Sequence, residues 1–229
     1  WYEVGTGPDG NRALVRHVVD ADENKHTFGV GVGDVNGDGR PDILRPSGWY
    51  EAPTDIRTGT WKQHPLSVGG LEEGTADHTP QILVYDVNAD GLNDIVTSIA
   101  HNYGIFWYEQ GKGDPEPTWK RHVIDKSWSQ AHSFELADID ADGDLDLVTG
   151  KRFMAHNGGD PGEFEPLGVY WYELDRGTSP TWTKHNISYD QGIGSGLTLR
   201  VVDLDGDGDL DVVVTGKWGG PAWFENLMK

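Results

Sequence analysis

The sequence DVNGDGRPD at residues 34–42 decides the fold, because it returns three more times along the chain. The later copies are DVNADGLND at 86–94, DIDADGDLD at 138–146 and DLDGDGDLD at 203–211, at intervals of 52, 52 and 65 residues. We refer to these four nine-residue segments as the Asp loops. A period of about 50 residues is typical of repeat proteins in which each repeat forms one small unit of secondary structure.

Two further sequence motifs recur with about the same period as the Asp loops. A Trp-Tyr-Glu or Trp-Phe-Glu triplet begins at Trp1, Trp49, Trp107, Trp171 and Trp223. About a dozen residues after the triplet begins a Trp-x-x-His motif, or in the first copy a weaker Leu-x-x-His, which ends at His17, His64, His122 and His185. Each repeat therefore reads as four strands: one before the Asp loop, one after it, one with the triplet and one ending at the histidine. We predict an all-β fold, a β-propeller of four-stranded antiparallel blades. A β-sandwich is the alternative, but sandwiches do not repeat so regularly.

The repeat also predicts how the chain is divided. We expect one β-propeller domain with a partial blade at 1–25, blades at 26–77, 78–129 and 130–190, and a partial blade at 191–229. A ring of seven such blades would need about 360 residues, so we expect three complete and two partial blades of a larger ring. The first residue is Trp1, which favours a processed form or a fragment. A four-bladed ring with a spare strand is the alternative.

The composition and charge of the chain limit the classes of partner that it can bind. The 229 residues carry a formal net charge of −20 and include no cysteine. The acidity argues against nucleic acid, since phosphate would be repelled. Without cysteine, disulfides and thiol chemistry are excluded, which is compatible with a bacterial secreted protein. The sequence contains no run of about 18 apolar residues, so it predicts no membrane span. No targeting segment is visible.

The Asp loops have the spacing of calcium ligands. Side-chain oxygens stand at positions 1, 3, 5 and 9, position 7 can add a backbone carbonyl, and a glycine at position 6 allows the sharp turn. Hard oxygen ligands favour Ca²⁺ over zinc or copper. We expect about four structural Ca²⁺ ions, one per loop, although a single Asp-Gly turn could be only a hairpin former. The predicted ligands are Asp34, Asn36, Asp38, Arg40, Asp42, Asp86, Asn88, Asp90, Leu92, Asp94, Asp138, Asp140, Asp142, Asp144, Asp146, Asp203, Asp205, Asp207, Asp209 and Asp211.

These loops resemble the FG-GAP/VCBS repeats of propellers with integrin-α-type calcium loops, over nearly the whole chain. That resemblance implies a secreted protein, extracellular or periplasmic, but no single activity. The histidine before the first strand, together with the triplet and the later histidine, is similar to the propeller domain of the aldos-2-ulose dehydratase family. In that family the propeller carries a metal-dependent sugar-dehydrating site.

The face opposite the Asp loops gathers other chemistry. His26, His78 and His132 precede the first strands of three repeats, and Ser195 takes that place in the fourth. First strands line the axis of a propeller, so these histidines could converge on one Zn²⁺ or other divalent metal. Histidines at strand entrances could instead bond a neighbouring blade. The loops of this face add the other candidate catalytic residues, which are His101, Tyr103, Lys151, His156 and Lys217.

Two functions remain open at this point. In the first, the protein is a sugar lyase or dehydratase with its site on the histidine face, where the third repeat carries extra residues at 155–167. In the second, it is a non-catalytic calcium-stiffened module that binds glycan or protein. Trp128 and Trp218 break the repeat and could stack on a sugar ring or pack at the rim. A serine hydrolase is unsupported, because no Gly-x-Ser-x-Gly segment occurs.

Overall fold

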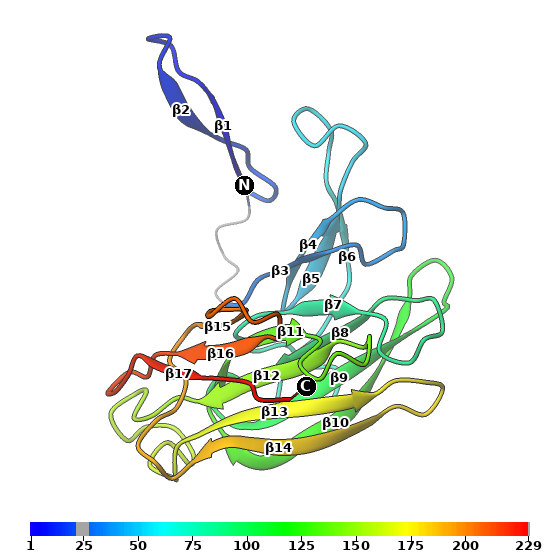
Figure 1. Cartoon of the computed structure of the whole chain (residues 1–229). Coiled ribbons are helices and arrows are strands. Elements are labelled where there is room, and N and C mark those ends of the chain that lie inside the picture. The colour runs from blue at the N-terminus through cyan, green and yellow to red at the C-terminus, as the bar shows by residue number, and fades with distance from the viewer. Residues whose placement is uncertain (22–27, 229) are drawn as a thin grey trace.

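A computed structural model describes residues 1–21 and 28–228 of the chain. Strands are its only regular elements within those residues, and they follow one another along the chain as successive small sheets (Figure 1). The strands are β1 (Tyr2–Thr6), β2 (Arg12–Arg16), β3 (Gly31–Gly33), β4 (Asp42–Arg45), β5 (Gly48–Glu51), β6 (Lys62–His64), β7 (Leu83–Tyr85), β8 (Asp94–Ser98), β9 (Tyr103–Gly111), β10 (Thr118–Ser129), β11 (Ala131–Ala137), β12 (Asp146–Lys151), β13 (Gly168–Asp175), β14 (Thr181–Tyr189), β15 (Leu199–Val202), β16 (Asp211–Val214) and β17 (Ala222–Phe224).

The sheets are the predicted blades. β3–β6, β7–β10 and β11–β14 each form a four-stranded antiparallel sheet whose spatial order is the chain order, and β15–β17 form a three-stranded one. In every case the Asp loop joins the first two strands, and the Trp triplet lies on the third. The prediction of an all-β propeller is confirmed. The number of blades in a complete ring stays a prediction.

The first strands of successive blades lie side by side. β3 contacts β7, β7 contacts β11, and β11 contacts β15. The approach of β3 to β7 is close enough to require glycine, because a Cβ added at Gly31 would lie 2.2 Å from the carbonyl oxygen of Ile82. A parallel bridge between Val30 and Gln81 continues the same contact. The blades therefore pack around a common line of first strands.

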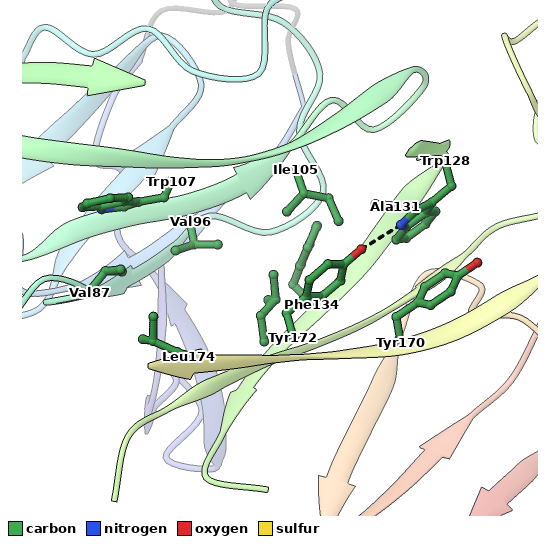
Figure 2. Packing of buried hydrophobic residues seen from close by; sticks show 11 residues of the cluster. Val87, Val96, Ile105, Trp107, Trp128, Ala131, Phe134, Tyr170, Tyr172 and Leu174 are labelled. Carbon is green, nitrogen blue, oxygen red and sulfur yellow. Dashed lines mark hydrogen bonds between the residues drawn. The ribbon is translucent and has the colours of Figure 1, made fainter. Parts of the chain in front are cut away.

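The hydrophobic core lies between blades. The largest cluster joins Val96 and Trp107 of one blade to Phe134 and Tyr172 of the next, and all four side chains are buried. Figure 2 shows Trp128, at the end of β10, reaching across to β13, where its Nε1–H donates to Tyr172 Oη over 2.8 Å. Burial of aromatic surface at each junction supplies the main stabilisation, since each such side chain removes 150–250 Å² from water.

The histidine of each fourth strand packs within its own blade. The ring stacks on the Trp of the third strand, with centroids 4.0–4.3 Å apart in the pairs Trp1–His17, Trp49–His64, Trp107–His122 and Trp171–His185. The neighbouring glutamate of the triplet pairs with the same imidazole, as in His122 Nε2 to Glu109 Oε2 at 2.7 Å. These four histidines serve the blade rather than a site.

The hairpin of β1 and β2 repeats the outer half of a blade. It carries a Trp triplet on its first strand and the matching histidine after its second. In Figure 1 it extends away from the other sheets. It is nevertheless tied to the β3–β6 blade, because Arg57 Nε donates to Glu3 Oε2 over 2.7 Å.

Candidate functional site

The Asp loops share one hydrogen-bonding pattern. The carboxylate at position 1 accepts backbone N–H groups from later in its own loop, as in Gly37 N and Gly39 N to Asp34, both at 2.8 Å. Equivalent bonds reach Asp86, Asp138 and Asp203. The loops are thereby curled so that their other carboxylates come together.

The aspartate at position 9 ties strands together. Asp42, Asp94, Asp146 and Asp211 are fully buried. Each accepts one N–H from position 2 of its loop and one from just beyond the Trp triplet. For Asp94 these are Val87 N at 3.1 Å and Gln110 N at 2.8 Å. Burial raises the pKa of Asp94 and of Asp146 to about 6, so their surroundings disfavour a bare negative charge.

Two loops bring three carboxylates together within the described residues. One oxygen from each of Asp138, Asp140 and Asp142 lies within 4.8 Å of the others, and the same is true of Asp203, Asp205 and Asp207. Asp138 Oδ1 is buried without a hydrogen-bond partner. This all-oxygen donor set, with one unpartnered oxygen, fits a hard cation such as Ca²⁺.

The first two loops differ, because each has Asn at position 3 and an arginine on its carboxylates. Arg40 pairs with Asp38 of the first loop. Arg176, from the next blade, lies 3.0 Å from Asp86 Oδ2 of the second loop. These two loops are therefore less negative than the third and fourth.

The other end of the first strands carries the histidine cluster, which we define as His78, His101, His132 and His156. The ring centroid of His101 lies 5.7 Å from those of His78 and His132 and 4.5 Å from that of His156. The rings of His78, His101 and His132 also contact Phe28. The cluster draws on the start of the second blade, its β8–β9 turn, β11, and the segment between β12 and β13.

A metal-ligand group lies at one side of this cluster. Ligand atoms of His101, His156 and Asp160 all fall within 4.8 Å of one another, and His156 Nδ1 is 2.9 Å from Asp160 Oδ2. Neither His78 nor His132 belongs to such a group, counting the described residues only. His26 lies outside the described residues, so the convergence of His26, His78 and His132 on one ion stays a prediction.

His132 is held neutral. Burial, followed by the positive charge of Arg152, lowers the pKa of His132 to about 3, and the same two causes lower the pKa of His101. The Nε2 atom of His132 is buried, and it has no hydrogen-bond partner among the described residues. A neutral imidazole nitrogen without a partner suits a metal, or a ligand group that can hydrogen-bond to it.

His78 is arranged differently. Its side chain is 39% exposed, and its Nδ1 lies 2.6 Å from Asp77 Oδ1. A carboxylate in that position fixes the ring and leaves Nε2 for other partners.

The predicted catalytic lysines hold the segment that carries His156 and Asp160. Lys151, fully buried, donates from Nζ to Ser129 O, Ser129 Oγ and Gly162 O at 2.7–3.0 Å. Lys217 Nζ donates to the carbonyls of Met154 and Ala155 at 2.7 and 3.1 Å. The two lysines therefore fasten residues 152–167 from two blades.

Tyr103 stands at the edge of the same segment. Its Oη donates to Glu165 Oε1, and this bond raises the pKa of Tyr103. Glu165 Oε2 lies 3.8 Å from Lys151 Nζ. The phenol, the carboxylate and the ammonium thus form one network, so Tyr103 also braces this loop.

Sequence reasoning missed Asp160 and Arg152 as site residues. The guanidinium of Arg152 is 3.9 Å from Asp160 Oδ2 and donates to Gln130 Oε1 at 2.9 Å. Asp160 stands in the extra length of the third blade, where no repeat position marks it, and Arg152 directly follows β12. The signal available was that length itself, together with an Asp four residues after His156.

Comparison with known proteins supports the repeat. Residues 86–149 match the family model of the FG-GAP-like repeat. Within this β-propeller, that segment matches the FG-GAP-like repeat, the resemblance that the sequence predicted. No helix in the described part of the chain is long and apolar enough to cross a membrane.

Two particular proteins are similar to this chain. It is 24% identical over 192 residues to the aldos-2-ulose dehydratase of Phanerodontia chrysosporium, an alignment that takes in 78% of this chain and 20% of that protein. Among solved structures, an Agrocybe aegerita lectin described as recognising non-reducing terminal N-acetylglucosamine matches with a TM-score of 0.50 and 21% identity. That match covers 86% of this chain and 52% of the lectin. The chain thus spans a fifth of one protein and about half of the other.

Proposed function

We propose that this protein is a calcium-stabilised propeller that acts on a sugar as a lyase of the dehydratase kind, with one divalent metal on its histidine face. The observation that carries the proposal is the group of His101, His156 and Asp160. The dehydratase and the lectin, each similar to this chain, support carbohydrate as the ligand class. The predicted Ca²⁺ ions suit a secreted location, where calcium is abundant.

The residues present fit a transition-metal ion. Ligand atoms around a tetrahedral zinc at about 2.1 Å are about 3.4 Å apart. Atoms within 4.8 Å of one another therefore need only small side-chain shifts to close on one ion. Two imidazoles and a carboxylate leave a coordination position open, which is the arrangement of catalytic zinc sites. When bound, such an ion would polarise a ketose carbonyl and acidify the adjacent carbon.

The chain's own groups can carry the proton. We assign the general base to His78, whose ring Asp77 orients through Nδ1. Its Nε2 would take the proton from the carbon next to the carbonyl. A C=C bond then forms as the C–O bond at the following carbon breaks, and the leaving hydroxyl takes the proton from the protonated His78 and departs as water. His132 Nε2, buried and unpartnered, would accept a hydrogen bond from a sugar hydroxyl and so orient the ring.

Metal content of the purified chain tests the proposal. Elemental analysis by mass spectrometry should find calcium plus about one zinc or other transition-metal ion per chain. Asp160→Asn and His101→Ala should remove the transition metal and leave calcium unchanged. His122→Ala is the matched control, because it removes an imidazole of the fourth strand, outside the cluster. Calcium alone in the wild type would refute the metal site.

An assay of turnover distinguishes the two candidate functions, a sugar lyase and a non-catalytic binding module. With a ketose substrate, an enzyme should release water and form an enone, which is followed by ultraviolet absorbance. Sugar binding without turnover would favour the second candidate, a non-catalytic glycan-binding module. The similarity to a lectin is the observation that favours it.

A further inference from the structure

A second polar feature lies beside the histidine cluster. A pocket of about 420 Å³ opens between the third blade and the β15–β17 blade, lined by Arg152, Leu197, Thr215, Gly216 and Lys217 among others. The structure describes all residues of the two blades that form this pocket up to Met228. It brings two cations together in a chain whose net charge is −20.

Neither cation is fully neutralised by the chain. Arg152 has a side chain only 10% exposed, yet the carboxylate that pairs with it, Asp160, is 3.9 Å away, and Glu163 adds a second negative charge nearby. Within the part of the chain that the structure describes, the Nε–H of Arg152 has no hydrogen-bond acceptor. The two acceptors of Lys217 are neutral carbonyls, and none of the described carboxylates pairs with it. A buried charge with incomplete pairing is costly, so an anion from outside would be favoured here.

Arg152 also joins this pocket to the proposed metal group. It lines the pocket, contacts Asp160, and lies close enough to His101 and His132 for its charge to act on both. Trp218 follows the lining residue Lys217, whose Nζ lies 5.6 Å from the Trp218 ring centroid, and Trp218 is 62% exposed. An exposed indole beside a polar pocket is a platform on which a sugar ring can stack.

We infer that the pocket between Arg152 and Lys217 binds the carboxylate of a sugar acid, so that a uronic acid residue of a glycan is the substrate or ligand class. The planar guanidinium suits a carboxylate, and the ammonium adds a second donor. The hydroxyls of the same ring would then face the histidine cluster. The inference rests on the proposed carbohydrate ligand and adds the charge that this ligand carries.

Calorimetric titration tests it with two probes, methyl glucuronide and methyl glucoside, on the calcium-loaded chain. The wild type should bind the glucuronide at least about tenfold more tightly than the neutral glucoside. Because Lys217 also holds Met154 and Ala155, Lys217→Gln can weaken the binding of both probes, but it should weaken glucuronide binding about five- to tenfold more than glucoside binding. Lys217→Arg should keep most of the affinity. Lys112→Gln is the control, because it removes the same charge from an exposed lysine in the β9–β10 turn. Arg152→Gln should weaken glucuronide binding further.

The result of this titration can be distinguished from the result of the experiments that test the proposed function. The carboxylate preference should persist in His101→Ala, which lacks a proposed metal ligand. Its persistence in a protein without turnover would support the pocket while the lyase proposal fails. Equal affinity for the two probes, or equal loss in Lys217→Gln and Lys112→Gln, would overturn the inference while leaving the metal site standing. A sugar sulfate that binds more tightly than the glucuronide would also overturn it.

Discussion

Lys151 gives the sharpest prediction, because an ammonium group is buried completely beneath the site. Burial lowers the pKa of Lys151 from 10.5 to about 8, against the opposing effect of Glu165. Between these values the unfolded chain binds more protons than the folded one, so the free energy of unfolding rises with pH across this window. The shift of about 2.5 units corresponds to about 3 kcal/mol in all. About 2 kcal/mol of that rise falls between pH 7.5 and 9.5.

Lys151→Met keeps a long side chain and removes the titrating group. Urea unfolding at pH 7.5, 8.5 and 9.5 should therefore show that the wild type gains about 2 kcal/mol relative to the variant as pH rises. Tyrosine titration is common to both proteins and cancels in the difference. Lys112→Met, an exposed lysine, should show no such gain relative to the wild type. Parallel curves for wild type and Lys151→Met would mean that Lys151 is charged and well solvated, and the reasoning would be refuted.

Three further predictions concern the blades. Gly31→Ala should lower the melting temperature by several degrees, since its Cβ would meet Ile82 O at 2.2 Å, whereas Gly177→Ala, where a Cβ meets nothing within 4 Å, should be neutral in the same calorimetric scan. Tyr172→Phe leaves the buried Nε1–H of Trp128 without its acceptor and should cost about 1–3 kcal/mol in urea unfolding; an unchanged midpoint would contradict this. Calcium chelation at neutral pH should lower the melting temperature, and added Ca²⁺ should restore it, because binding to the folded state alone is linked to stability; a melt indifferent to chelator would remove the calcium assignment.

The fold was predictable from the sequence because the same local pattern of residues occurs in every repeat. One Asp-Gly turn is ambiguous, but four loops with one spacing, each followed by a Trp triplet, leave few alternatives to a blade. The position-9 aspartates show what spacing could not reveal. The sequence marks Asp94 as a metal ligand, and the structure shows that it also joins three strands through Val87 N and Gln110 N.

The candidate site was predictable only in part. His78 and His132 could be found because histidine recurs near the start of the first strands, although the structure places His132 inside β11 rather than before it. His101 and His156 could be found because they stand in loops of the same face. Asp160 could not be found in this way, since it has no counterpart in the other blades. Its contact with His156 depends on how residues 152–167 fold, and that is decided by tertiary bonds from Lys151 and Lys217 rather than by local pattern.

The site thus depends on departures from the repeat and on the junction of two blades. Residues 155–167 are an addition to the third blade, yet Lys217, which holds Met154 and Ala155, comes from the β16–β17 turn of the next blade. Arg152 faces both the metal group and the pocket that this junction forms. Because loops open at lower free energy than the sheets that carry them, loosening of the third and fourth blades should disturb ligand binding before the blades themselves unfold. With Ca²⁺ bound as we propose, the Asp loops at the far end of the same sheets would then act on function indirectly, by keeping that junction closed.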